Sequence, residues 1–185
     1  MKKLLCIAVS LIMLFMLTAC GGNNDGTSVS DGTDGKGLLS SFTAETLDGE
    51  KADQSIFEGK KVTMVNIWAT FCGPCINEMP DLQKLHEDYA DKGFQVVGIV
   101  CDIYEYNGVF DESGIKTAKD IVKDTGVKYV SLLPSESLNE AKLKDVTSVP
   151  ETLFVDETGS VIAGPYIGSR SYDSWAQIID EVLAK

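Results

Sequence analysis

The chain has 185 residues, a formal net charge of −12 at neutral pH and 44% hydrophobic residues. Such an acidic balance argues against a nucleic-acid partner and against electrostatic adhesion to anionic lipid. Five cysteines along a chain of this length are too sparse for a small domain stapled by disulfides. We therefore expect a domain with a hydrophobic core and no nucleic-acid partner.

The N-terminus carries the features of a bacterial export signal. Two lysines precede an apolar run from Leu4 to Leu17, which is short for a transmembrane helix of about 20 residues. The segment closes in Leu-Thr-Ala-Cys, which resembles the lipobox of bacterial lipoproteins, where cleavage precedes the cysteine. We therefore expect a lipoprotein signal peptide at residues 1–19 and a lipid on the sulfur of Cys20. The alternative is an ordinary cleaved signal with a chance cysteine.

A polar segment separates this signal from the rest of the chain. Residues 21–37 are almost entirely Gly, Asn, Asp, Ser and Thr, so they cannot bury a core. We expect residues 20–37 to form a lipidated flexible tether. Residues 38–185 remain, and their number suits one domain without a visible internal repeat.

The hydrophobic pattern of this domain predicts the order β-α-β-α-β-α-β-β-α after an N-terminal hairpin. The hairpin is expected from residues 42–47, an Asp48-Gly49 turn and a short partner at 54–57. An irregular stretch at 102–113 enlarges the centre. This order predicts an α/β fold with a mixed central sheet and helices on both faces. The expected strands are 62–68, 94–101, 129–133, 152–155 and 160–166, and the expected helices are 74–92, 115–125, 137–146 and 172–183.

The motif Cys72-Gly73-Pro74-Cys75 stands at the junction of the first buried strand and the first helix. Two thiols at the start of a helix suit reversible thiol–disulfide exchange. The unpaired N–H groups and the dipole of the helix favour an anion at Cys72, so Cys72 is the expected attacking thiolate and Cys75 the resolving thiol. The alternatives are a structural disulfide or half of a zinc site. A zinc site needs more soft ligands than the chain offers, so we expect no metal and no cofactor beyond the redox-active Cys72–Cys75 pair.

The acidic residues Glu78 and Asp81 follow the cysteines. Glu78 is three residues after Cys75, so helical spacing places both on one face. A buried Glu78 would have a raised pKa and could exchange a proton with Cys75. The alternative is an exposed acid that favours the helix N-terminus. Because Lys and Arg are absent near Cys72, we expect its pKa to be only moderately lowered.

Three segments resemble the membrane-anchored TlpA/ResA-like branch of the thioredoxins. Trp-Ala-Thr-Phe-Cys-Gly-Pro-Cys at 68–75 is similar to that family's Trp-Ala-x-Trp-Cys-x-Pro-Cys. Glu-Met-Pro at 78–80 matches its Glu-x-Pro, and Ser-Val-Pro at 148–150 resembles its cis-proline loop. The resemblance covers 38–185 and implies a thioredoxin fold with a central insertion. Phe71 departs from the pattern, because the family usually has tryptophan there.

The resemblance also implies a surface that binds an extended substrate strand. In that family a cis-proline, here Pro150, exposes the preceding backbone, here Val149, whereas a plain turn proline is the alternative. Trp68 is expected to be partly buried and Phe71 to lie near the surface by the cysteines; both could instead belong to the core. The Gly-Pro dipeptide between the cysteines is the one that thioredoxin has, and the resemblance implies that the cysteine pair acts as a reductant. The residues expected to contact substrate are Trp68, Phe71, Gly73, Pro74, Val149 and Pro150.

Other residues carry weaker expectations. Asn66 stands where cytoplasmic thioredoxins have a buried Asp, as is common in the branch that the chain resembles. Cys101 is expected to be a buried core thiol, or otherwise an accessory thiol. His86 is expected to be solvated. Three aromatic residues could line a substrate groove or pack the insertion: Tyr104, Tyr106 and Phe110.

These features predict a monomeric, lipid-anchored thiol–disulfide oxidoreductase on the extracytoplasmic face of a bacterial cell membrane. It would reduce disulfides in exported proteins, such as apocytochrome c or a methionine sulfoxide reductase. The resemblance implies re-reduction by a membrane thiol-transfer protein of the CcdA type. The main alternative is an oxidase that introduces disulfides. A peroxidase lacks its Pro-x-x-x-Thr-x-x-Cys context here, and a copper-binding assembly factor would use C-x-x-x-C with a distal His.

Overall fold

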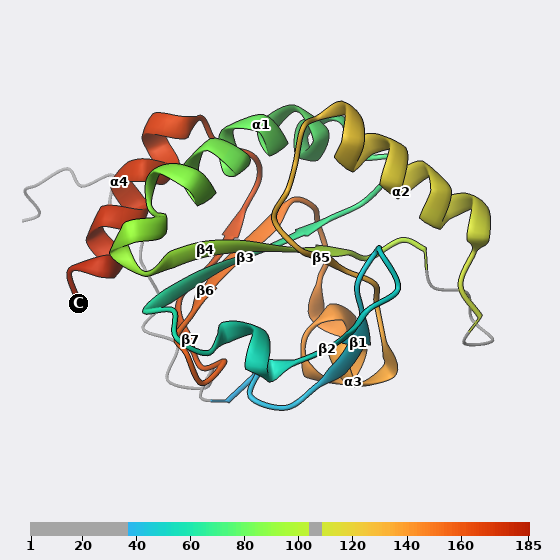
Figure 1. The fold of residues 1–185 in the computed structure, drawn as a ribbon, viewed down its shortest axis with the longest axis horizontal. Coiled ribbons are helices and arrows are strands. Elements are labelled where there is room, and N and C mark those ends of the chain that lie inside the picture. Colours follow the sequence, from blue (N-terminus) through green and yellow to red (C-terminus); the bar gives the residue numbers. More distant parts are fainter. Residues whose placement is uncertain (1–36, 104–108) are drawn as a thin grey trace, which may run out of the picture. The chain divides into compact units, whose positions relative to one another are not determined.

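The computed structural model describes residues 37–103 and 109–185 (Figure 1). The expected signal peptide, Cys20 and nearly all of the expected tether lie outside these residues, as do Tyr104 and Tyr106. Within the described ranges, no helix combines the length and apolarity needed to cross a membrane. The strands are β1 (Thr43–Glu45), β2 (Lys51–Asp53), β3 (Val62–Trp68), β4 (Phe94–Val100), β5 (Ser131–Leu132), β6 (Glu151–Val155) and β7 (Val161–Ile167). The α-helices are α1 (Gly73–Asp88), α2 (Glu112–Asp124), α3 (Glu136–Ala141) and α4 (Tyr172–Leu183).

Five strands form one mixed sheet in the order β5-β4-β3-β6-β7. β3 and β4 run parallel, with Val62 opposite Phe94 and Trp68 opposite Val100. β4 and β5 are also parallel, whereas β6 is antiparallel to both β3 and β7. The mixed sheet predicted from the order of elements is confirmed.

Helices cover both faces of this sheet. Figure 1 shows α1, α2 and α4 on one face and α3 with the β1–β2 hairpin on the other. β3 lies in the middle and all seven of its residues are buried, so its side chains alternate between two cores. Met64 and Trp68 belong to the core beneath α1 and α4, while Val65 and Ile67 belong to the core beside α3.

The N-terminal hairpin is present, but its second strand is not the expected one. β1 pairs antiparallel with β2, and Gly49 in the turn has a φ of 87°, which suits glycine. Residues 54–57, the expected partner, form a 3-10 helix instead. The reason is local: the Asp53 carboxylate accepts a hydrogen bond from the Ser55 N–H at 2.9 Å and so starts a helical turn there.

Capping side chains determine where the later helices begin. The Asp111 carboxylate accepts a hydrogen bond from the Ser113 N–H at 2.9 Å, so α2 starts three residues before its predicted start. The Ser135 hydroxyl caps α3 through the Leu138 N–H at 3.1 Å. The helix predicted at 137–146 is divided, because α3 ends at its sixth residue and a separate 3-10 turn follows.

His86 is not solvated as expected, because it covers an unpaired part of β4. β5 has only two residues, so the Val96 N–H faces no strand and donates instead to His86 Nδ1 at 3.0 Å. Gln83, one turn earlier in α1, accepts hydrogen bonds from the backbone N–H groups of residues 128 and 129 at 2.8 and 3.2 Å. Side chains of α1 therefore satisfy backbone groups at the β5 side of the sheet.

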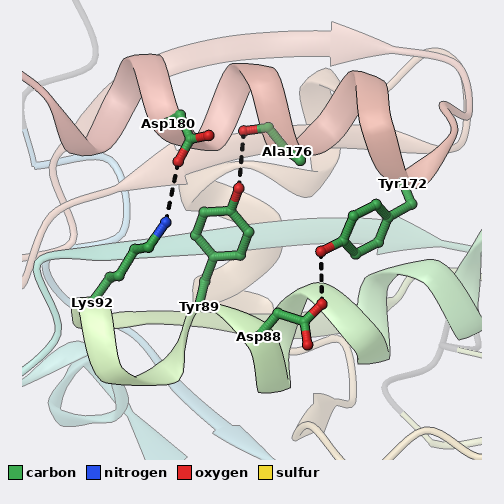
Figure 2. Close-up of polar contacts among 6 residues, drawn as sticks. All are labelled: Asp88, Tyr89, Lys92, Tyr172, Ala176 and Asp180. Atoms are coloured by element: carbon green, nitrogen blue, oxygen red, sulfur yellow. Dashed lines mark hydrogen bonds and ion pairs between the residues drawn. The ribbon is translucent and has the colours of Figure 1, made fainter.

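Polar contacts fasten α4 along α1 and the short turn that follows it (Figure 2). The contacts join Tyr172 Oη to Asp88 Oδ2 at 2.6 Å, Tyr89 Oη to Ala176 O at 3.4 Å and Lys92 Nζ to Asp180 Oδ1 at 3.4 Å. The Tyr172 N–H also donates to Asp81 at 3.1 Å. These contacts fix the register of α4 on α1 and thereby place Trp175, which is fully buried, against the middle of α1.

Candidate active site

The cysteine pair lies at the start of α1. Cys72 and Cys75 form a disulfide with their Cα atoms 5.3 Å apart. Cys72 is the N-cap residue, and its sulfur accepts a hydrogen bond from the Cys75 N–H at 3.2 Å. Pro74 occupies the first helical turn, where its missing N–H costs nothing. Cys72 is 6% exposed and Cys75 is fully buried, so Cys72 is the sulfur that a second molecule can approach.

The turn that leads into Cys72 is tied to the end of the neighbouring strand. Asp102 Oδ2 accepts hydrogen bonds from the Thr70 N–H at 2.9 Å and from the Thr70 hydroxyl at 2.6 Å. The Cys72 N–H donates to the Ala69 carbonyl at 3.0 Å and closes the turn. The sequence did not identify Asp102 as part of the site; its only signal was a carboxylate directly after a buried strand parallel to β3.

Glu78 is buried one helical turn after Cys75 and is only 3% exposed. Its Oε1 accepts a hydrogen bond from Asn66 Nδ2 at 3.1 Å. Its Oε2 accepts from the Arg170 backbone N–H at 3.1 Å and from Trp175 Nε1 at 3.2 Å. Burial raises the pKa of Glu78 above its ordinary value, and the three hydrogen bonds offset only part of that rise. The expectation of a buried Glu78 is confirmed, and the exposed alternative is wrong.

Arg170 lies close to Glu78 without forming an ion pair with it. Its guanidinium stacks over the ring of Trp175, with 4.9 Å to the centroid, and over Tyr166 at 5.3 Å. Its Nη1 donates to the Gly168 carbonyl at 2.8 Å. The positive charge of Arg170 therefore lowers the pKa of Glu78 only as a minor influence, behind burial and the hydrogen bonds.

Four of the residues around Glu78 come from distant parts of the chain. Asn66 is in β3, and Thr152 is directly opposite in β6 and accepts from Asn66 Nδ2 at 3.1 Å. Arg170 and Trp175 lie in or just before α4. Sequence reasoning noted Asn66 only as a departure from the thioredoxin pattern and missed the other three. The available signal was a polar residue, Asn66, inside a strand made mostly of apolar residues.

The expected cis-proline loop lies beside the cysteine-bearing strand. The Val149–Pro150 peptide bond is cis, as the resemblance implied. Pro150 is buried and Val149 is half-buried. Glu151, the next residue, pairs with Ile67 near the end of β3. The loop therefore reaches the end of the sheet at which Cys72 follows β3.

The other expected substrate contacts differ in exposure. Phe71 is 77% exposed, and Gly73 and Pro74 are exposed beside it, as expected for residues near the surface by the cysteines. Trp68 is fully buried, so the expected partial burial is wrong. It is the last residue of the central strand and packs in the same core as Cys75, which removes it from contact with a substrate. Substrate binding by the exposed residues stays a prediction.

Cys101 follows β4 and is half-buried as a free thiol between the two cores. Burial raises the pKa of Cys101 to about 11, and the nearby Asp102 charge adds to the rise. It is therefore a poor nucleophile, although it is half-buried rather than fully buried as expected for a core thiol. Phe110 is half-buried and packs against the core beneath α1 and α4.

A second buried carboxylate lies on the opposite face of the sheet. Glu151 is opposite Ile67, whose side chain belongs to the core beside α3. Lys142 forms an ion pair with Glu151, and the two side chains are 9% and 3% exposed. Because Lys142 caps the end of α3 and Glu151 follows Pro150, the ion pair closes the segment that carries the cis-proline.

Metal ligands do not gather in the described part of the chain. Among residues 37–103 and 109–185, no group of three or more His, Cys, Asp or Glu side chains is placed to hold a metal ion. The chemistry that the arrangement offers is that of a dithiol with a buried acid beside it.

Comparisons with known proteins point to one family. The family model described as Redoxin matches residues 25–169. Thioredoxin-like protein YneN of Bacillus subtilis is 32% identical over 139 residues, which cover 75% of each chain. Thiol-disulfide oxidoreductase ResA of Halalkalibacterium halodurans is 26% identical over 121 residues, covering 65% of this chain and 62% of that protein. The crystal structure of a thioredoxin-family thiol:disulfide interchange protein from Chlorobium tepidum is similar with a TM-score of 0.63 and 28% identity, covering 77% of this chain and 93% of that one.

Proposed function

The chain belongs to the Redoxin family and is a thiol–disulfide oxidoreductase of the TlpA/ResA-like kind with a thioredoxin fold, and from this premise we propose that it reduces disulfides in exported proteins. One observation carries the proposal. Cys72, the more accessible sulfur of the Cys72–Cys75 disulfide, lies at a helix N-terminus, and a buried acid, Glu78, lies one turn after Cys75. This arrangement favours a thiolate at the surface and a proton acceptor in the interior.

In the first step, the reduced protein attacks a substrate disulfide. The Cys72 thiolate forms a bond to one substrate sulfur, the substrate S–S bond breaks, and the other substrate sulfur leaves as a thiolate that takes a proton from water. The N–H groups in the first turn of α1, of which the Cys75 N–H contacts the Cys72 sulfur, stabilise the attacking anion. The product is a mixed disulfide between Cys72 and the substrate.

In the second step, Cys75 releases the substrate. Cys75 gives up its proton, and its thiolate attacks the Cys72 sulfur. The Cys72–Cys75 bond forms, the bond between Cys72 and the substrate sulfur breaks, and that substrate sulfur leaves as a thiolate that takes a proton from water. Two electrons have passed from the dithiol to the substrate. Glu78 is the proposed acceptor of the Cys75 proton, because its raised pKa lies closer to that of a thiol than an ordinary carboxyl group does.

The substrate strand is proposed to lie along the loop that contains Val149, next to the exposed Phe71, Gly73 and Pro74. What supports this is their exposure around Cys72 and the place of the cis-proline loop beside β3. An extended strand can pair with backbone groups there irrespective of its sequence, which suits varied clients.

The proposed location is the outer face of a bacterial membrane, with a lipid on Cys20 and residues 20–37 as the tether. The signal-like pattern at residues 1–19 and the lipobox-like Leu-Thr-Ala-Cys support this location. Oxidised protein would be re-reduced by a membrane thiol-transfer protein of the CcdA type. Cytochrome c maturation or support of a methionine sulfoxide reductase are the proposed client roles, and the protein is proposed to act as a monomer.

The direction of electron flow is tested by the reduction potential of the Cys72–Cys75 couple in the full chain, equilibrated in dithiothreitol or glutathione buffers. We expect a value near the roughly −270 mV of thioredoxin or below. A value near the roughly −120 mV of a strong oxidant would instead support the introduction of disulfides into exported proteins. Cys72→Ser is the control, because it removes the couple.

A further inference from the structure

Asn66 is fully buried and bridges two other buried side chains. Its Nδ2 donates to Glu78 Oε1 at 3.1 Å and to Thr152 Oγ1 at 3.1 Å. Its Oδ1, on the other side of the same amide, is buried and has no hydrogen-bond partner among residues 37–103 and 109–185. One end of the amide thus makes two hydrogen bonds, and the other end makes none in the described part of the protein.

This arrangement suits an ionised Glu78 but not a protonated one. A carboxylate only accepts hydrogen bonds, and its three contacts from Asn66, Arg170 and Trp175 are all donors. A protonated carboxyl group must also donate one. The backbone N–H of Arg170 and the indole N–H of Trp175 can only donate, so neither can receive that proton. Among these contacts, only Asn66 carries an acceptor, and that acceptor is the unpartnered Oδ1.

We propose that the Asn66 side chain turns its amide by half a rotation when Glu78 takes up a proton, and that Thr152 reverses its hydrogen bond with it. In the ionised state, Nδ2 donates to Glu78 and to Thr152. In the protonated state, Glu78 donates from Oε1 to Asn66 Oδ1, and the Thr152 hydroxyl donates to the same oxygen. Asn66 is therefore a positioning residue that serves both protonation states, and this inference rests on the proposed proton exchange at Glu78.

The exchange requires no repacking. The nitrogen and oxygen of an amide are nearly equal in size, so the rotation changes which atom faces Glu78 without changing the volume filled. A hydroxyl group can either donate or accept, so Thr152 follows by turning its hydrogen. One amide atom of Asn66 is left without a partner in each state. The unpartnered atom is the oxygen in the ionised state and the nitrogen in the protonated state, and the proton on Glu78 decides which of them faces the carboxyl group.

Among residues 37–103 and 109–185, none of the other charged and titratable groups that face Glu78 is hydrogen-bonded to it as an acceptor. On its own helix, Cys75 precedes it by one turn. From the segment before α4, Arg170 presents a backbone N–H and a positive charge. From the segment before β5, the Tyr129 hydroxyl is buried without a described partner, and the charge of Glu78 contributes to raising the pKa of Tyr129. Burial raises the pKa of Tyr129, so its hydroxyl stays neutral while Glu78 titrates.

The test is NMR spectroscopy on the full chain with labelled asparagine side chains, across a titration of Glu78. Above the midpoint for Glu78, we expect cross-peaks between the Asn66 amide protons and the side chain of Thr152. Below the midpoint, these cross-peaks weaken strongly, because the amide protons have turned away. In Glu78→Gln, the new amide donates toward Asn66 at every pH, so the cross-peaks stay weak throughout.

Glu87→Gln is the matched control, since it removes an exposed carboxylate from the same helix and leaves the titration of the Asn66 signals unchanged. Cross-peaks of equal strength above and below the midpoint, and equally strong in Glu78→Gln, would overturn the proposal. The wild-type titration decides the question even where the variant folds poorly. Failure of the wild-type protein to reduce disulfides in insulin would instead overturn the proposed function and leave the NMR result standing.

Discussion

Glu78 and Glu151 are both 3% exposed, but they lie on opposite faces of the sheet in different electrostatic settings. Glu151 contacts a buried cation, the ammonium group of Lys142. Glu78 contacts three N–H donors from groups without charge, and Arg170 gives it a backbone N–H while its guanidinium stacks on Trp175. One carboxylate is neutralised by a partner, whereas the other is only solvated by dipoles.

This contrast separates a structural acid from a reactive one. Glu151 and Lys142 depend on each other, because removing one charge leaves the other unpaired in the interior. Dipoles stabilise a buried carboxylate less completely, so burial still raises the pKa of Glu78. The acid next to the cysteines therefore keeps access to both protonation states, while the acid beneath the cis-proline loop holds that loop in place.

The largest expected effect comes from breaking the ion pair. Lys142→Met leaves Glu151 buried and unpaired, and we expect the free energy of unfolding to fall by about 3–5 kcal/mol. Urea denaturation at neutral pH measures the loss. The double variant Lys142→Met/Glu151→Leu is the matched control and should recover most of the stability, because it replaces both charges with apolar groups. A double variant as unstable as the single one would contradict a structural role for the pair.

The next largest effect is on the pKa of Glu78, which depends on the N–H groups that donate hydrogen bonds to it. Trp175→Phe keeps an aromatic ring but removes the indole N–H that donates to Glu78 Oε2 at 3.2 Å. A hydrogen bond to a charged group contributes about 1.5–3 kcal/mol, so the pKa of Glu78 should rise by about one to two units. The carbon NMR signal of the Glu78 carboxyl group reports this pKa. An unchanged midpoint would mean that the indole does not stabilise the carboxylate.

A third test compares how the stabilities of wild type and Glu78→Gln depend on pH. Because the pKa of Glu78 is raised in the folded protein, its contribution to stability is fully present below the ordinary value of 4.5 and is lost as the pH rises through the folded-state pKa. The variant does not titrate there. Urea denaturation at a series of pH values should therefore show wild-type stability falling relative to the variant, by about 1.4 kcal/mol per unit of pKa shift. A parallel pH dependence of the two proteins would contradict the raised pKa.

The smallest effect concerns His86, a partly buried base whose neutral ring accepts a hydrogen bond from the Val96 N–H. Burial, and secondarily the charge of Lys60, lower its pKa from the ordinary 6.5. Its contribution to stability is therefore present above pH 6.5 and is lost as the pH falls through the folded-state pKa, and partial exposure to solvent keeps that loss small. Thermal unfolding of wild type and His86→Asn from neutral to mildly acidic pH measures it. Equal losses in both proteins would contradict this assignment.

Local patterns explain what could be predicted from the sequence. The buried strand at 62–68 and the amphipathic helix at 172–183 have the predicted bounds, because each has a continuous apolar run or a helical stripe of its own. The cysteine motif and the spacing from Cys75 to Glu78 are local too. The burial of Glu78 could be offered only as one of two alternatives, because it depends on what packs over α1.

The rest of the site depends on contacts that sequence spacing does not reveal. Trp175 and the Arg170 backbone reach Glu78 from more than 90 residues away, and Thr152 meets Asn66 only because β6 pairs with β3. The strand predicted at 129–133 shrinks to two residues, since α1 binds the backbone before it through Gln83. Trp68 is a large aromatic residue of the kind that often contacts a substrate, but it ends a strand that is buried on both faces.

The contact of α1 with β4 also removes a possible site of strand pairing from the sheet. A strand edge with free N–H groups is a template on which another chain can add a strand and begin to aggregate. Here His86 takes up the Val96 N–H that the two-residue β5 leaves unpaired, so a helix closes the edge where a strand is missing. The exported clients proposed above would present unpaired strands while they fold. The Val96 N–H, held by His86, would not be available to pair with them.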